Sequence, residues 1–257
     1  MPRRGTARAA PGALVLVLSA VAGAQAGECE RLRHQDQTHV VCTARTGDDL
    51  RLFLTDAEGE TLGSFTRIDE MLVEEDARLA FAMNAGMYHP DRRPVGLYIE
   101  DGAERAPIVT REGPGNFGLL PNGVFCIHDG GFAVIESRAF ADNPPDCRHA
   151  SQSGPMLVID GDLHPRFVEG SDSLRVRNGV GVSADGRAAH FVISTGTVNF
   201  HDFAAFFRDA LGVPQALYFD GNVSRLHAPG LGRSDWGLPM GPVVGKVVPV
   251  DGVNPSE

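Results

Sequence analysis

Short apolar runs recur along most of the chain, and each is bounded by Gly, Pro, Asn or Asp. The runs are rich in β-branched and aromatic residues, and their length is typical of strands rather than helices. We therefore predict strands at ten places: Leu50–Thr55, Leu79–Met83, Val95–Glu100, Gly123–His128, Phe132–Ser137, Met156–Ile159, Gly179–Ser183, Ala189–Ser194, Ala216–Phe219 and Val243–Val248.

Asp-Gly pairs separate several of these runs and predict how the strands connect. They occur at 101–102, 129–130, 160–161 and 185–186. Gly reaches positive φ without steric cost, and Asp hydrogen-bonds its own backbone, so the pair favours tight hairpin turns. Neighbouring strands are therefore expected to pair in the antiparallel sense.

Two segments show helical spacing instead. The first, Arg67–Ala77, places Ile68, Met71 and Leu72 on one face. The second follows Asn199 as a cap, carries a phenylalanine stripe interpreted as core, and stops at Gly212 before Pro214. With no repeat or linker along the chain, the expected fold class is α+β: a strand-rich mixed sheet core with a few helices in a single domain.

The N-terminus resembles a targeting segment. Three arginines precede an apolar run from Ala13 to Ala24, and Ala24-Gln25-Ala26 fits the small-residue rule for signal-peptidase cleavage. We predict a signal peptide at residues 1–26 and a functional domain at 27–257. The apolar run is shorter than a membrane-spanning helix needs. The mature protein is therefore expected to be periplasmic or secreted, without membrane insertion after cleavage.

The cysteine count agrees with export. Four cysteines in an exported chain favour two disulfides, and partners close in sequence are the easiest to align, which pairs Cys29 with Cys42 and Cys126 with Cys147. Free buried thiols are the alternative. The formal net charge of −10 and the lack of a basic tract argue against nucleic acid as a partner.

Candidate chemistry is concentrated where predicted strands end. The chain has no phosphate-binding glycine loop with Lys, no GxSxG, no HExxH and no Cys-pair zinc pattern. Instead, Asn84 closes one apolar run, Arg177 precedes another, and Asp220 ends a third. A rigid sheet holds such positions at the edge of solvent, where sites are often built. The plainer alternatives are a turn cap for Asp220 and a surface ion pair for Arg177.

Four ordered segments resemble the motifs of the phosphodiester glycosidase family, in its short exported bacterial branch. They are NAGMY at 84–88 with PVGL at 94–97, QSGPML at 152–157, RNGVG at 177–181, and Asp220-Gly221 with Ser224. The resemblance runs from about Leu79 to Ala228. The chain departs from the family pattern at Ala85, Met87, Asn222, Val223 and Arg225, which leaves the natural sugar open.

This resemblance implies hydrolysis of the bond between the anomeric carbon (C1) of a sugar and a phosphodiester oxygen. A carboxylate would act as nucleophile or base, and Asp220 is the candidate. Arginine grips phosphate through two hydrogen bonds, which indicates Arg177 first and Arg225 second. Asn84 is expected to join Asp220 and Arg177 as a catalytic residue. The other expected substrate-binding residues are Gly86, Tyr88, His89, Gln152, Ser153, His201, Gly221, Asn222 and Ser224, with either histidine available to shuttle a proton.

Two other functions fit the same residues. One is a phosphodiesterase that cuts the other phosphate ester bond and releases a sugar-1-phosphate. The other is a non-catalytic envelope module that binds a polysaccharide or phosphoglycan. No cofactor is indicated with certainty; a divalent cation bridging carboxylate and phosphate is possible, although no liganding pattern identifies one.

Overall fold

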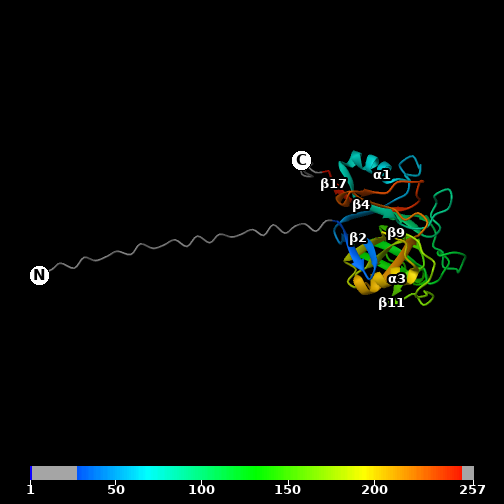
Figure 1. Cartoon of the computed structure of the whole chain (residues 1–257). Coiled ribbons are helices and arrows are strands. Elements are labelled where there is room, and N and C mark those ends of the chain that lie inside the picture. The colour runs from blue at the N-terminus through cyan, green and yellow to red at the C-terminus, as the bar shows by residue number, and fades with distance from the viewer. Residues whose placement is uncertain (2–27, 251–257) are drawn as a thin grey trace.

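Three antiparallel sheets form the body of the molecule (Figure 1). The structure is a computed structural model that describes residues 28–250 together with Met1, so the predicted signal peptide lies outside the described part of the chain. The first sheet has the strand order β1 (Cys29–His34), β2 (Gln37–Arg45), β13 (Ala188–Ser194), β12 (Asn178–Val182), β14 (Gln215–Asp220), β10 (Met156–Ile159) and β11 (Asp162–Leu163).

The other two sheets are smaller. The second has the order β16 (Arg233–Ser234), β15 (Leu226–Ala228), β4 (Ala77–Asn84), β17 (Val243–Pro249) and β3 (Asp49–Phe53). The third has the order β6 (Ala103–Ala106), β5 (Tyr98–Glu100), β9 (His149–Ser153), β7 (Gly123–His128) and β8 (Gly131–Glu136).

The strand-rich α+β class and the single domain are confirmed. Each of the ten predicted strands overlaps an observed one, and the four Asp-Gly pairs join β5 to β6, β7 to β8, β10 to β11 and β12 to β13 as hairpins. One detail differs from the expected mixed sheet. All strand pairs given by the described residues are antiparallel, some joined by hairpins and the others by longer connections.

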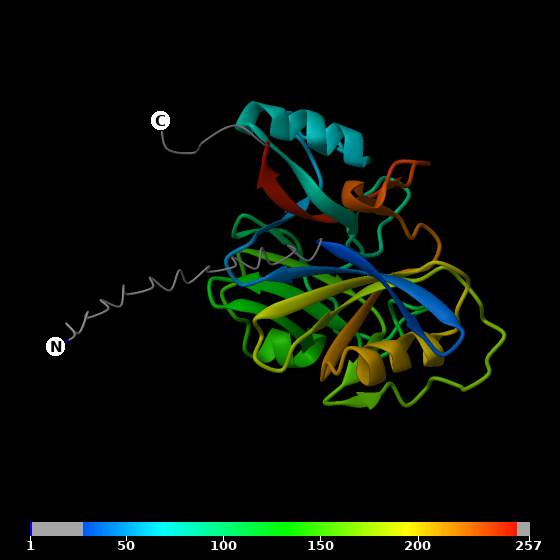
Figure 2. The same ribbon diagram turned by 60° about the vertical axis from the view of Figure 1, so that its left-hand side comes forward.

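Helices cover two opposite ends of this body (Figure 2). Helix α1 (Phe65–Leu72) starts at the cap Ser64, continues as a 3-10 turn η1 (Val73–Glu75), and packs Ile68 and Leu72 on the second sheet. Helix α3 (Phe200–Ala205) is capped by Asn199 as predicted and continues as a π-turn η2 (Phe206–Ala210). Its phenylalanine stripe is buried against the first sheet, which confirms the core interpretation. Two short helices complete the set: α2 (Ser137–Asp142) and η3 (Pro229–Leu231).

A group of phenylalanine rings joins the three sheets into one core. Phe125 of β7 lies 5.5 Å from Phe191 of β13 and 6.4 Å from Phe219 of β14, measured between ring centroids. Phe81 of β4 lies 5.6 Å from Phe191. All four rings are fully buried, and aromatic pairs at such distances contribute beyond the area that they bury. Each sheet therefore contributes to the same core.

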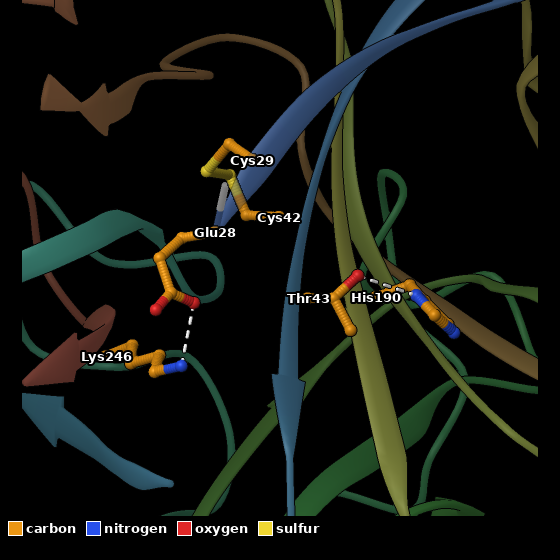
Figure 3. The surroundings of a disulfide bond; sticks show 6 residues. All are labelled: Glu28, Cys29, Cys42, Thr43, His190 and Lys246. Atoms are coloured by element: carbon orange, nitrogen blue, oxygen red, sulfur yellow. Dashed lines mark hydrogen bonds and ion pairs between the residues drawn. A yellow bond between two sulfur atoms is a disulfide. The ribbon is translucent and has the colours of Figure 1, made fainter. Parts of the chain in front are cut away.

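Both predicted disulfides are present. Cys29 pairs with Cys42 directly across β1 and β2, and Cys126 of β7 pairs with Cys147. Figure 3 shows the first bond beside an ion pair between Glu28 and Lys246, whose atoms lie 2.7 Å apart. Because Lys246 belongs to β17, this contact ties the start of the described chain to the second sheet. No helix among the described residues is long and apolar enough to cross a bilayer.

The Cys126–Cys147 bond should contribute measurably to stability. It closes 21 residues of sequence, so the Cys126→Ser/Cys147→Ser double variant should lose about 3 kcal/mol of unfolding free energy, since its unfolded chain is less restricted. Urea unfolding followed by circular dichroism, with the wild type kept oxidised, measures the loss. An unchanged urea midpoint would contradict this expectation.

Candidate active site

A cleft of about 550 Å³ opens beside the end of β14. Four separate segments line it, and they lie far apart in sequence: the hairpin after β4, the loop before β7, the loop after β14, and the segment before β17. The lining residues are Met87, Tyr88, Arg92, Val95, Pro114, Gly115, Asn116, Phe117, Asp220, Asn222, Val223, Leu238 and Pro239. Among the described residues, Asp220 is the one carboxylate and Arg92 the one cation that line this cleft.

Asp220 both caps a turn and faces the cleft. One carboxylate oxygen, Oδ1, accepts hydrogen bonds from the backbone N–H groups of Gly221 (2.6 Å) and Asn222 (2.9 Å), while Oδ2 accepts from Val223 (3.2 Å). The residue is 7% exposed, and burial raises the pKa of its carboxyl group, although the three backbone hydrogen bonds oppose that shift. The turn therefore fixes the orientation of the carboxylate at the cleft wall.

A buried pair of asparagines supports this turn. Asn84 at the end of β4 donates from Nδ2 to Oδ1 of Asn178 (3.2 Å), and Asn178 donates back to the Asn84 carbonyl oxygen (2.8 Å). The Asn84 Oδ1 accepts from the Arg225 backbone N–H (2.9 Å). Both asparagine side chains are fully buried. Asn84, predicted to be catalytic, is thus a residue that positions the loop after Asp220.

The structure places Arg177 in the protein interior rather than at the cleft wall. Its guanidinium is 1% exposed and does not line the cleft. It donates to the carbonyl oxygens of Ser173 and Val198 (2.8 and 2.9 Å) and to the Tyr218 hydroxyl (3.2 Å). It also lies 3.6 Å from the centre of the Phe200 ring. These contacts give the guanidinium partners inside the protein, and one of them holds the Tyr218 hydroxyl in place. The surface ion pair proposed as its alternative is also not formed among the described residues.

Arg225 does not line the cleft but contacts a segment that does. Its Nη1 donates to the Leu238 carbonyl oxygen at 2.6 Å, and a side chain at Gly237 would overlap its guanidinium. Arg225 therefore holds the segment that forms one wall of the cleft, next to Asn222 and Tyr88, which line it directly.

Three further polar residues have partners inside the protein rather than in the cleft. Gln152 Oε1 accepts from the Leu97 and Val109 backbone N–H groups, both at 3.0 Å. Ser153 donates to the Phe219 carbonyl oxygen at 3.0 Å, and the Ser224 hydroxyl donates within its own loop. In this structure these three side chains hold neighbouring strands and loops together.

The two candidate histidines and the two candidate glycines also lie outside the cleft lining. His89 is exposed in the hairpin after β4, and His201 contacts Asp202 on α3 (3.1 Å), at another part of the molecule. Gly86 and Gly221 have a packing role. A side chain at Gly86 would lie 2.9 Å from the Ser151 hydroxyl, and one at Gly221 would overlap the Tyr218 hydroxyl.

The sequence reasoning missed several cleft residues, above all Arg92, Asn116 and Leu238. One feature could have indicated Arg92: the charged turn sequence PDRRP lies between two segments that resemble family motifs. The other two lie in irregular segments with no recognisable pattern. Within the described part of the chain, no group of three or more His, Cys, Asp or Glu side chains is placed to hold a metal ion.

Comparison with known proteins places the chain in a class defined by its fold and motifs. The phosphodiester glycosidase family matches residues 77–228. The uncharacterized protein YigE of Escherichia coli (strain K12) is 33% identical over 187 residues, which cover 73% of this chain and 72% of that protein. The chain therefore belongs to the phosphodiester glycosidase family, a family of hydrolases.

Two solved structures share the fold. The catalytic domain of zebrafish N-acetylglucosamine-1-phosphodiester alpha-N-acetylglucosaminidase, auto-inhibited by its pro-peptide, aligns with a TM-score of 0.57 at 14% identity, over 85% of this chain and 81% of that one. A Burkholderia pseudomallei K96243 protein, BPSS2145, which its name describes as exported, aligns with a TM-score of 0.52 at 12% identity, over 82% and 74% of the two chains.

The asparagine pair should carry much of the local stability. In Asn178→Ala, the buried Asn84 amide and Ser224 hydroxyl lose a partner, so the unfolding free energy should fall by about 2 to 3 kcal/mol. The matched control is Asn222→Ala, an exposed asparagine in the adjoining loop, which should change stability by about 0.5 kcal/mol or less. Urea unfolding measures both, and equal effects would refute the special role of the buried pair.

Proposed function

We propose that this protein hydrolyses a glycosyl phosphodiester by breaking the bond between C1 of the sugar and the phosphate oxygen. The single observation that carries the proposal is the cleft itself, whose lining includes one buried carboxylate, Asp220, and one guanidinium, Arg92. Glycosidases that expel an alcohol use two carboxyl groups, one of them as a general acid. A phosphate leaves as an anion without a strong acid, so one carboxylate suffices for this reaction.

In the proposed reaction, the C1–O bond breaks and its electron pair moves to the phosphate oxygen. Asp220 acts at C1, either as a nucleophile or as the base for a water molecule. Water supplies the new hydroxyl group at C1, and its second proton is released as the phosphomonoester departs. The three backbone N–H groups that hold Asp220 keep its orientation fixed, which favours a defined approach to C1.

The substrate we infer is a glycan or glycoconjugate of the cell envelope or the extracellular space. Two disulfides favour an oxidising compartment, and the relative named as exported supports a periplasmic or secreted location. Met87, Asn222 and Val223, which depart from the family pattern, all line the cleft. These differences support a sugar or aglycone (the group on the far side of the phosphate) distinct from those of other family members.

Purified protein should release free reducing sugar from an alkyl-phosphate-linked or nucleotide-linked N-acetylhexosamine. Asp220→Asn should reduce kcat/KM at least about 100-fold, because the neutral amide cannot act as nucleophile or base. The matched control is Asp185→Asn, at an exposed turn between β12 and β13, which should leave kcat/KM unchanged. Circular dichroism verifies that both variants are folded.

Product analysis separates this proposal from its rivals. In water labelled in its oxygen, cleavage at C1 leaves the phosphomonoester unlabelled, whereas cleavage at phosphorus labels it. Release of sugar-1-phosphate would instead establish the phosphodiesterase. Saturable binding without turnover across several sugars would establish a binding module. If free sugar is released and Asp220→Asn retains full activity, the reaction stands and the assigned carboxylate is wrong.

As the pH falls, activity should be lost at a higher pH than it would be if the catalytic aspartate had an ordinary pKa. Burial raises the pKa of Asp220 above the usual 3.8, so the carboxyl becomes protonated, and inactive, before ordinary aspartates do as the pH falls. The phosphodiester itself stays anionic over this range. The pH profile of kcat/KM measures the acid limb, and a limb at or below 3.8 would contradict the role of Asp220.

A further inference from the structure

We propose that Arg92 is the residue that binds the phosphate group of the substrate, in the cleft that it shares with Asp220. This inference rests on the proposed hydrolysis and assigns its anion site to a residue outside the recognised family motifs. Among the described residues that line the cleft, Arg92 is the one cation. A chain with a net charge of −10 repels anions overall, so a phosphate must be held by a local positive group.

The backbone of Arg92 is the first supporting observation. The residue lies at the tip of a hairpin in which Tyr88 pairs with Pro94, and its own N–H donates to the His89 carbonyl oxygen at 2.8 Å. Its φ is +72°, a left-handed conformation that glycine or asparagine adopts at lower cost than arginine. Four other non-glycine residues among those described share a positive φ at turns, but of the five only Arg92 lines this cleft, so the conformation places a cationic side chain at the cleft wall.

The neighbouring arginine shows what an ordinary surface role looks like at the same turn. Arg93 donates to the Asp91 carboxylate at 2.7 Å and its side chain is 78% exposed. Arg92 instead lies over the Tyr88 ring, 5.4 Å from its centre, and no ion pair joins it to a carboxylate within residues 28–250. Its charge is therefore available in the cleft, and the aromatic face orients the guanidinium.

Two other arginines near the cleft are not among the residues that line it. The guanidinium of Arg177 is enclosed by carbonyl oxygens and aromatic rings, and Arg225 donates to the Leu238 carbonyl oxygen. The backbone N–H groups that follow Asp220 donate to its own carboxylate. Arg92 is thus the arginine at the cleft wall that can bind a phosphate through two parallel N–H groups.

The position of Arg92 in the cleft also suits the negative charge that develops on the phosphate during the proposed reaction. As the C1–O bond breaks, the phosphate gains a second negative charge, and a guanidinium already beside it binds the departing group more strongly than the substrate. Arg92 should therefore affect kcat as well as KM. In the proposed reaction, the Asp220 carboxylate of the same cleft acts at the sugar carbon, which develops positive charge.

Arg92→Gln should lower kcat/KM on an alkyl-phosphate-linked N-acetylhexosamine by about 10- to 100-fold, consistent with the loss of a charge-assisted contact. It should also weaken binding of inorganic phosphate, measured by isothermal titration calorimetry, by at least about 10-fold. The matched control Arg93→Gln, one residue away and already paired with Asp91, should leave both quantities within about 2-fold of wild type.

Arg92→Gly distinguishes binding from a purely structural role. Glycine removes the side chain and also relieves the positive φ, so thermal unfolding should occur at or above the wild-type midpoint while phosphate binding is still lost. Wild-type phosphate affinity and kcat/KM in Arg92→Gln would overturn the proposal, as would equal losses in Arg93→Gln.

These outcomes are separable from failure of the proposed function. If no phosphodiester yields free sugar, yet Arg92→Gln loses phosphate binding that Arg93→Gln retains, the anion site stands and the reaction is wrong. If free sugar is released and Arg92→Gln matches wild type in both measurements, the reaction stands and the anion site is wrong.

Discussion

The hydrogen bonds between Asn84 and Asn178 are the constraint on which the cleft depends. They join the end of β4 in the second sheet to the start of β12 in the first, where no strand ladder connects the two sheets. In the same register, Asn178 lies opposite Asp220, and Asn84 accepts the backbone N–H of Arg225. The loop that leaves the first sheet and enters the second is thus held at both ends by one buried amide pair. Because unpaired buried amides are costly, the pair fixes both strand ends together.

Around this junction, residues that support the cleft are distinct from residues that face it. Arg177 is enclosed by carbonyl oxygens and aromatic rings, and it anchors the Tyr218 hydroxyl directly against Gly221. Glycine at 221 lets the turn after Asp220 lie on that hydroxyl without a side chain between them. The motif residues therefore have two different functions in the structure. One carboxylate, Asp220, lies at the cleft, and buried residues behind it fix its orientation.

Sequence predicted the parts of the fold that depend on local pattern. Apolar runs bounded by Asp-Gly turns gave the strands, because hairpin turns and strand burial are encoded within a few residues. Strand β9 was missed because its sequence, HASQS, is polar although all five residues are buried. Gln152, the fourth residue of this strand, is stabilised by backbone groups of distant segments, and no local pattern reveals such partners. Asp220 was found because it ends an apolar run next to a turn pair, which is a local pattern. The burial of Arg177 and the place of Arg92 at the cleft depend on distant segments, so the sequence did not reveal them.

Because the described residues that line the cleft include a single carboxylate, the proposed reaction should depend on the leaving group of the substrate. An alcohol must be protonated as it leaves a sugar, and the cleft lining offers no second carboxyl group for that step. A phosphate needs charge stabilisation instead, which a guanidinium provides. Such a site selects its substrate through the leaving group more than through the sugar. In the proposed reaction, cleft residues such as Met87, Asn222 and Val223 could then differ from the family pattern without altering the bond that is broken.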